Sequence, residues 1–465
     1  MSSVAPEPTP PGPAADADER KHDLRAVRDA VRTSPGALRL TLVRFSSQFG
    51  DGMFQAALSG AILFNPERET DPLAVAAGFA VLLLPYSVIG PYAGALLDRW
   101  DRRLVLLIAN ILRGLLILAV TAGLLTGIGA SPLLLLALAV VGISRFTSAG
   151  VSAALPRVLS QRWLVTANSV LATAGSACAA VGAAAGVAVI GLIGAGDTGS
   201  AVAVAVSAAG SVAGGLLAAG FRPRVLGPET KSGDTAGAVR AVLAGLVVGA
   251  RAVRRSVDVS SAMIGIGTHR IVFGANTLIM VLVLREAPAA GTTVDGGLIG
   301  FGVAITATAS GMLGAALLTP FLIPRLGRSR TVLLALSCAI VVQLALVAPT
   351  ALADSADATH RAHQLLLAGA FLFGLAGQTV KLTGDAAMQI EIADDRRGQV
   401  FALQDTVFNI AFVLAVALTA VVVPADGRSI VVVLMGAVCY GAGAVAVLSN
   451  NRRAHTIMPS GSGSA

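Results

Sequence analysis

Long apolar runs recur along the chain, and they constrain its fold more than any other feature. Each is about as long as the ~20 residues that a helix needs to cross a bilayer. Hydrophobic residues make up 55% of the chain and charged residues only 13%, whereas soluble domains carry roughly 25% charged residues. These values exclude an ordinary soluble enzyme and predict an all-α integral membrane protein with twelve spans. The expected spans are 38–63, 73–97, 104–125, 133–155, 164–193, 201–220, 262–284, 298–322, 331–349, 365–383, 400–423 and 430–448.

The runs divide six and six around a polar segment, which predicts two six-helix bundles. The expected divisions are an N-terminal tail (1–37), the first bundle (38–220), a linker (221–261), the second bundle (262–448) and a C-terminal tail (449–465). Within the linker, the apolar stretch 237–250 is too short to span a bilayer. Because Arg251, Arg254 and Arg255 follow it, we expect an interfacial helix there.

The N-terminal tail divides into two parts. The first ~18 residues are rich in Pro and Ala, and we expect them to be disordered. Residues 19–33 place Leu24, Val27 and Val31 at helical spacing between arginines. This pattern fits either a short interfacial helix on an anionic membrane surface or a solvated charged tail.

The basic residues predict the orientation of the chain in the membrane. The formal net charge is +8, but the basic residues border apolar runs, which argues against nucleic acid as a partner. If both termini are cytoplasmic, only Arg68, Arg285, Arg361 and Arg428 fall in outer loops. Most of the others then lie on the cytoplasmic side, as the positive-inside rule requires. We therefore expect a multi-pass protein of the inner (plasma) membrane with both termini in the cytoplasm.

The loop after the second run carries a motif. It begins at Gly94 and contains Asp98, Arg99, Arg102 and Arg103. The loop resembles the G-x-x-x-D-R-x-G-R-R signature of the major facilitator superfamily. A degenerate copy follows the eighth run as PFLIPRLGRS. The spacing between the two copies matches the spacing between the first and seventh runs to within about two residues, so the halves resemble a parallel repeat.

The resemblance implies a role for this loop. In the family, the loop locks the bundles together on the cytoplasmic side when the transporter opens outward. Asp98 would accept from a neighbouring helix N-terminus, where the dipole favours an anion. The chain departs from the signature at Asp101, where Gly is usual, and at Pro324, which replaces the acidic residue in the second copy.

Shorter motifs resemble the macrolide and siderophore exporter branch of the superfamily. They are FGDG at 49–52, LPR at 155–157 with ANS at 167–169, and RGQVF at 397–401. The fifth run reads GAAAG at 182–186, where exporters usually carry G-P-x-x-G. This resemblance implies alternating access, with export driven by proton influx.

Polar and charged residues inside the apolar runs are the candidate functional residues, because they are expensive in hydrocarbon. The candidates for proton coupling and the substrate cavity are Asp51, Arg44, Arg145, His269, Arg270 and Gln378. In the superfamily, spans one, four, seven and ten line the central cavity, and these residues fall on those spans. Arg113 lies on the third span and is expected to brace the bundle. The residues leave open whether Asp51 couples protons or forms a structural ion pair with Arg44, Arg113 or Arg145.

A match to G-x-G-x-x-G at 194–199 follows an apolar helix rather than a strand, and His360 and His363 form a single i,i+3 pair in an expected outer loop. We therefore expect no metal or other cofactor and no enzymatic activity. The predicted function is proton-coupled export of an amphipathic small molecule, drug-like or siderophore-like, by a monomer in the lipid bilayer. Transport of an anionic metabolite or lipid is the alternative. A non-transporting membrane scaffold or sensor is the competing class.

Overall fold

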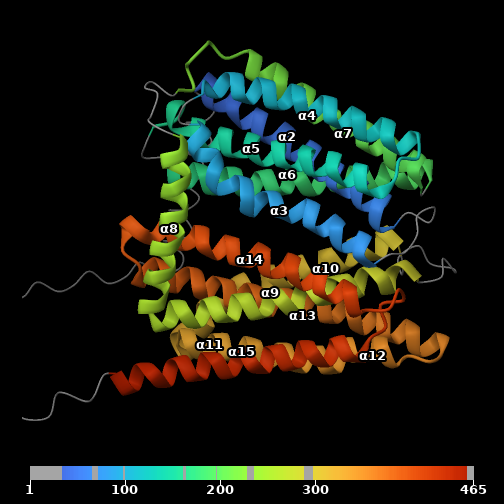
Figure 1. Cartoon of the computed structure of the whole chain (residues 1–465), viewed down its shortest axis with the longest axis vertical. Coiled ribbons are helices and arrows are strands. Elements are labelled where there is room, and N and C mark those ends of the chain that lie inside the picture. The colour runs from blue at the N-terminus through green and yellow to red at the C-terminus, as the bar shows by residue number, and fades with distance from the viewer. Residues whose placement is uncertain are drawn as a thin grey trace, which may run out of the picture.

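The computed structural model describes residues 34–64, 72–97, 100–160, 164–194, 196–227, 235–286 and 297–457. Within these ranges every regular element is a helix. The helices form two stacked blocks, with α2 to α7 in one and α9 to α15 in the other (Figure 1). Residues 1–33 lie outside the described ranges, and so do the predictions of a disordered segment and an interfacial helix there.

The first block contains six long helices. In chain order they are α2 (Pro35–Leu63), α3 (Pro72–Leu97), α4 (Arg102–Leu125), α5 (Ala130–Ala154), α6 (Leu164–Ile193) and α7 (Asp197–Ala219). A short 3-10 turn, η1 (Leu155–Arg157), follows α5. Ser34 caps α2 by accepting from the Ala37 amide, and its hydroxyl donates to the Val158 carbonyl. The cap therefore ties the start of α2 to the segment after α5.

The second block repeats this arrangement. Its helices are α9 (Val257–Glu286), α10 (Gly297–Leu326), α11 (Arg328–Val342), a π-helical turn η3 (Gln343–Val347), α12 (Ala348–Leu352), α13 (Ala356–Glu391), α14 (Asp394–Val422) and α15 (Ile430–Ile457). α11, η3 and α12 follow one another without a break and together form one span-length segment. The buried amides of Gln343 and Asn276 bond to each other at 2.6 and 3.2 Å, which joins the π turn to α9.

Between the blocks runs α8 (Thr235–Arg255), which lies along one end of the molecule in Figure 1. It contacts α14 of the second block and α3 of the first. A Cβ built on Gly249 would lie 2.9 Å from the Gln399 carbonyl oxygen, so the glycine lets α8 pack directly on the start of α14. Arg251, Arg254 and Arg255 are exposed.

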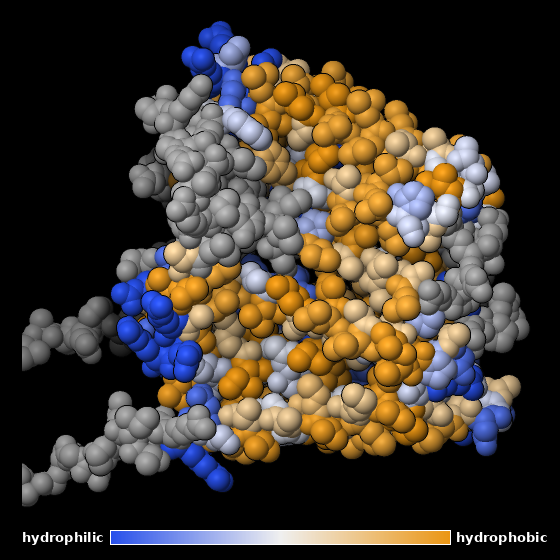
Figure 2. All heavy atoms as spheres, in the orientation of Figure 1, coloured by the Kyte–Doolittle hydropathy of each residue, from blue (hydrophilic) through white to orange (hydrophobic). Residues whose placement is uncertain are grey.

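The outer surface matches a lipid environment. Ten of the described helices are long and apolar enough to cross a membrane by length and composition. α2 and α3, with 29 and 26 residues, are also long enough to cross. Hydrophobic residues cover the helical wall of the molecule, and hydrophilic residues gather toward its two ends (Figure 2). In this environment a helix satisfies its own backbone hydrogen bonds, which lipid cannot do.

Small residues allow the closest helix pairs in each block. α2 packs most extensively on α6, where Gly52 faces the Ala179 backbone and Gly182 faces the Phe49 backbone. α10 packs in the same manner on α13, through Gly311 and Gly374. A side chain at these positions would collide with main-chain atoms, so the glycines set the helix spacing.

The blocks meet at the end of the molecule opposite α8. The Phe64 and Phe301 rings lie 5.2 Å apart, and Arg285 donates to the Leu63 carbonyl at 3.2 Å. Nearby, Phe79 of α3 and Phe412 of α14 make an edge-to-face contact at 5.9 Å. These contacts join the two blocks at this end.

Every long helix was predicted from the sequence, but several of the observed helices extend beyond the apolar runs that predicted them. The largest difference is α13, where the expected span 365–383 lies inside a 36-residue helix. The additional turns are polar, and Ser355 caps the first of them by accepting from the Ala358 amide. Hydropathy identifies the part of a helix in hydrocarbon, whereas capping decides where the helix begins.

Candidate functional site

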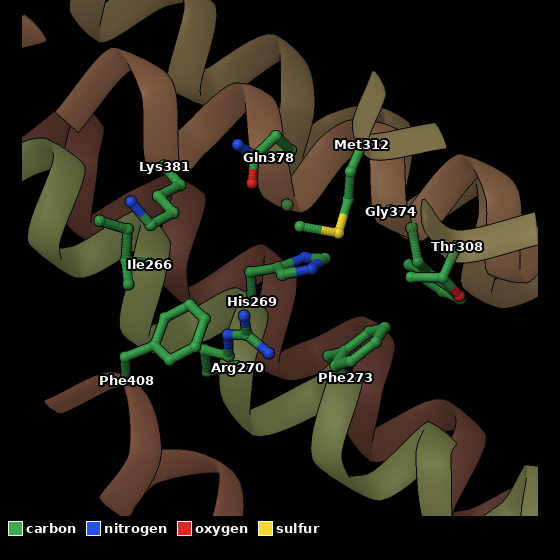
Figure 3. Close-up of a pocket in the computed structure, with 12 residues that line it drawn as sticks. Ile266, His269, Arg270, Phe273, Thr308, Met312, Gly374, Gln378, Lys381 and Phe408 are labelled. Carbon is green, nitrogen blue, oxygen red and sulfur yellow. The ribbon is translucent and has the colours of Figure 1, made fainter. Parts of the chain in front are cut away.

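A pocket with a cavity volume of about 70 Å³ opens within the second block, between α9, α10, α13 and α14. Its walls are mainly apolar and aromatic, with a few polar groups among them (Figure 3). The lining residues are Ile266, His269, Arg270, Phe273, Thr308, Met312, Phe373, Gly374, Gly377, Gln378, Lys381 and Phe408. Three candidates predicted from the sequence, His269, Arg270 and Gln378, therefore lie together in one pocket.

Arg270 is one of two basic residues that line this pocket, the other being Lys381. Its guanidinium carbon lies 3.1 Å from the centre of the Phe408 ring and 5.4 Å from that of Phe273. Stacking on an aromatic face holds a guanidinium by cation–π attraction and leaves its N–H groups free to donate at the edge. No carboxylate among the described residues forms an ion pair with Arg270.

His269 is fixed by its surroundings. Its Nδ1 lies 3.0 Å from the buried Tyr440 hydroxyl, and its ring packs against Phe273 and Phe373. Nε2 lies close to the Cα of Gly377, where a Cβ would clash with it. These contacts orient the imidazole as one wall of the pocket.

Lys381 lies at one edge of the pocket, and its ammonium group contacts Asp385 at 2.7 Å, one turn along α13. Gln404 of α14 donates to the other carboxylate oxygen of Asp385 at 3.1 Å. Gln404 is almost fully buried, and the Asp385 side chain is 20% exposed. Asp385 and Gln404 were not predicted from the sequence. Lys381, inside the expected span 365–383, and Asp385, just beyond its end, have the i,i+4 spacing of a helical ion pair, which is a detectable signal.

In the first block, Asp51 pairs with Arg113. Asp51 Oδ1 lies 3.2 Å from Arg113 Nη2, and the side chains are 5% and 0% exposed. The same guanidinium nitrogen donates to the Ser47 carbonyl at 3.4 Å. Of the three arginines that the sequence left open as partners for Asp51, Arg113 on α4 is the one at ion-pair distance. Neither Asp51 nor Arg113 lines the pocket.

Arg44 and Arg145 also lie away from the pocket. Arg44 lies beside Gly175 of α6, where a Cβ would be 3.6 Å from its Nε, and its buried Nη1 has no hydrogen-bond partner among the residues that the structure describes. Arg145 is half-buried on α5. The structure therefore separates the six predicted cavity residues into a group in the second block and a group in the first.

Part of the predicted lock falls within the described residues. Gly94 is in α3, and Asp98 and Arg99 lie outside the described residues. Arg102 donates to the carbonyls of Leu97, Ala153 and Leu226, and Arg103 donates to the Ala219 carbonyl at 3.0 Å. Both arginines thus join the ends of helices within the first block. Such carbonyl groups attract cations because the helix dipole is negative there.

Asp101, the departure from the signature, has its own role. It caps α4 by accepting from the Arg103 amide at 3.0 Å, and its second oxygen accepts from the Arg224 amide at 3.1 Å. In the second block Gly327 occupies the equivalent turn with a φ of 78°. Arg328, equivalent to Arg102, pairs with Asp258 at 2.7 Å and Glu391 at 3.3 Å. In the part of the chain that the structure describes, Arg102 donates to backbone carbonyls, and Arg328 pairs with carboxylates.

Together these features define a polytopic helical membrane protein with two six-helix bundles and, within the second, a mainly apolar pocket that holds a few polar groups. The chain belongs to the Major Facilitator Superfamily, whose family model matches residues 40–415. Uncharacterized MFS-type transporters of Mycobacterium tuberculosis and Mycobacterium bovis are each 41% identical over 430 residues, which cover 92% of this chain and 94% of theirs. The macrolide and siderophore exporter branch is not identified by these relatives.

Solved structures share the fold at low sequence identity. The nucleoside transporter NupG is 15% identical with a TM-score of 0.62, covering 89% of this chain and 98% of its own. A POT family transporter in complex with a thioalcohol-conjugated peptide is 12% identical with a TM-score of 0.60, covering 89% and 96%. A bacterial homologue of the lysosomal transporter Spinster, inward-facing and unoccupied, is 14% identical with a TM-score of 0.56, covering 89% and 97%.

Proposed function

We propose that this protein is a secondary active transporter that carries an amphipathic small molecule with an anionic group by alternating access. The observation that carries the proposal is Arg270, which lies in an aromatic pocket without a carboxylate partner among the described residues. A cation in such surroundings is expensive unless a function retains it. An anionic ligand would bond to the free edge of the guanidinium.

The apolar part of the substrate has a complementary surface. Phe273, Phe373 and Met312 line the pocket beside Arg270. Aromatic and thioether side chains favour flat or flexible apolar groups. The sequence left two substrate classes open, an amphipathic drug-like molecule and an anionic metabolite or lipid. The pocket favours an anionic substrate, and its apolar wall favours one that is also amphipathic.

The two blocks would supply the alternating access. The contacts of Phe64 with Phe301 and of Arg285 with Leu63 join them at the end opposite α8. The positive-inside rule places α8 and its arginines in the cytoplasm. In that orientation these contacts form the outer gate of an inward-facing state. The exporter-like motifs favour export, and proton coupling is part of the proposal.

Flux and binding in proteoliposomes test the proposal. The probes are 2-naphthoate, its uncharged analogue 2-naphthamide and the neutral nucleoside uridine, each with and without an imposed pH gradient. We expect saturable transport of 2-naphthoate and weak transport of the neutral probes. Arg270→Gln should weaken 2-naphthoate binding by about tenfold to a hundredfold, since a hydrogen bond to a charged group contributes roughly 1.5–3 kcal/mol.

Arg270→Lys is the matched control, because it retains the positive charge and should retain part of the affinity. Binding of 2-naphthamide should be nearly the same in all three proteins. Equal affinity of Arg270→Gln and wild type for the anionic probe would contradict the assignment of the pocket. Preferential transport of a cationic probe would contradict the anionic class.

A further inference from the structure

Next to the pocket, Asp385 is held by two donors that have different freedom to move. Its Oδ2 accepts from Lys381 Nζ at 2.7 Å, and its Oδ1 accepts from Gln404 Nε2 at 3.1 Å. Gln404 is 1% exposed and packed between helices, whereas the Lys381 side chain is 33% exposed and reaches the pocket on a flexible stem. Lys381 is thus the partner that can turn toward a ligand.

The charges around the pocket balance when it is empty. Arg270 of α9 and Lys381 of α13 are positive, and Asp385 of α13 and Asp405 of α14 are negative. Asp405 interacts electrostatically with both Lys381 and Asp385. From α10 the lining residues Thr308 and Met312 are uncharged, and His269 is held by Tyr440. At the end of α13, Glu391 and Asp258 are bound to Arg328.

A bound anion would disturb this balance. Lys381 and Arg270 line the same pocket, so an anionic group there competes with Asp385 for the ammonium group. When Lys381 turns away, Oδ2 of Asp385 loses its cation in a site that is 20% exposed, while Asp405 remains nearby. Loss of a cation, burial and a neighbouring carboxylate all favour the protonated form of a carboxyl group.

We infer that the Lys381–Asp385–Gln404 cluster is the proton-coupling site of this transporter: an anionic substrate takes Lys381 from Asp385, and Asp385 then binds one proton. The inference rests on the proposed anionic substrate. The proton comes from water and bonds to Oδ2, while Oδ1 continues to accept from Gln404. On substrate release, Lys381 returns and the proton leaves to water, so no other bond is made or broken.

Linkage determines the direction of coupling. If substrate binding raises proton binding, a proton raises substrate affinity by the same factor. Substrate and proton are then bound at the same time and cross the membrane in the same direction. An inward proton gradient therefore drives the anion inward. The cluster therefore predicts uptake, opposite to the export that the exporter-like motifs favour.

Proton release and uptake on binding test the inference directly. Purified protein in weakly buffered detergent solution is mixed with 2-naphthoate, and a pH indicator follows the protons. We expect wild type to take up about one proton per bound probe. Affinity should rise as the pH falls, by up to about tenfold per pH unit, the limit for one linked proton.

The variants separate the parts of the cluster. Asp385→Asn should bind 2-naphthoate with no proton uptake and no pH dependence, because the amide resembles the protonated acid. Lys381→Gln should lose affinity and proton uptake together. Asp385→Glu should keep the linkage. Glu391→Gln is the matched control, since Glu391 is a carboxylate on the same helix outside the pocket, and it should behave as wild type.

The outcomes distinguish this inference from the proposed function. Arg270-dependent binding without proton uptake would overturn the coupling site and leave the anionic substrate intact. Proton uptake that persists in a folded Asp385→Asn protein would also overturn it. Failure of every anionic probe to bind, or binding independent of Arg270, would instead overturn the proposed function and the inference together. Thermal unfolding of each variant checks that it folds.

Discussion

The carboxylate of Asp51 and the guanidinium of Arg113 lie inside the first bundle with almost no exposure to solvent. A buried ion pair contributes little beyond an apolar pair, but removing one partner leaves the other charge uncompensated. The pair joins α2 to α4, and neither side chain lines the pocket. We therefore assign it to bracing of the bundle, the role expected for Arg113 alone.

This assignment predicts a pattern of stabilities. Asp51→Asn and Arg113→Gln should each destabilise the protein by about 3–5 kcal/mol, since each leaves a buried charge without its partner. The double variant should be more stable than the sum of the two losses predicts. Thermal unfolding in detergent measures all three. A stable Asp51→Asn protein that fails only in proton-driven transport would instead restore Asp51 as a coupling residue.

At the scale of residues, the sequence predicts which side chains are exceptional better than it predicts their partners. His269, Arg270 and Gln378 were found because each interrupts an apolar run. The partner of Asp51 was left open because Arg44 lies on the same span and Arg113 and Arg145 lie on two others. The rotation of each helix about its axis, which decides among them, is not encoded in hydropathy. Phe408 was missed because an aromatic residue in a span is ordinary until its ring meets a guanidinium.

The helices of each bundle are held at short range by glycines. Between α2 and α6, Gly52 faces the backbone of Ala179, and Gly182 faces that of Phe49. Gly182 belongs to the GAAAG segment at 182–186, where exporters usually carry G-P-x-x-G, and in the structure it allows this close approach. Hydropathy predicted that these segments are helices, but not which of them touch.

Enlarging one of these glycines should separate the helices. Gly52→Val should destabilise the protein by at least the ~1–3 kcal/mol typical of overpacking, because backbone atoms of Ala179 cannot yield as a side chain can. Gly302→Val on α10 is the matched control, since a Cβ there meets nothing within 4 Å. Thermal unfolding and size-exclusion profiles compare the two. Equal behaviour of the variants would refute the close packing of α2 on α6.

The end opposite α8 should open when its interblock contacts are weakened. Arg285→Gln replaces the charged donor to the Leu63 carbonyl. We expect a population shift away from the joined state, seen as longer distances between spin labels at Leu73 on α3 and Ile299 on α10. Arg428→Gln is the control, because Arg428 donates to Ala353 within the second block. An unchanged distance distribution in Arg285→Gln would show that this contact does not hold the gate.

For the molecule as a whole, the twelve apolar runs and the near-repeat of the signature loop were sufficient to predict the fold. The contacts of the predicted cytoplasmic lock could not be predicted from the sequence. Arg102 and Arg103 bond to helix ends of their own block, and the motif does not encode that choice of acceptor. The ion pairs of Arg328 were equally hidden, because they depend on Asp258 and Glu391 from other helices.

Orientation in the membrane is a prediction at this scale. Single cysteines at Thr198 and Ala425, both exposed, should react with an impermeant maleimide added outside intact cells. A cysteine at Arg251 on α8 should react only after the cells are opened. The native residues Cys178, Cys338 and Cys439 are replaced first. The opposite pattern of labelling would invert the predicted topology.

The attachment of α8 has a practical consequence. This helix is seated on α14 through Gly249 and also contacts α3 of the other block. We therefore expect α8 to move with the second block, so that a movement between the blocks changes the distance from α8 to the first block. Trp100, exposed at the start of α4, is a native fluorophore on the first block. With Trp163 replaced by Phe, energy transfer from Trp100 to an acceptor dye at Arg251 would give an optical signal of each conformational change. Libraries of compounds could then be screened for ligands before any substrate is known.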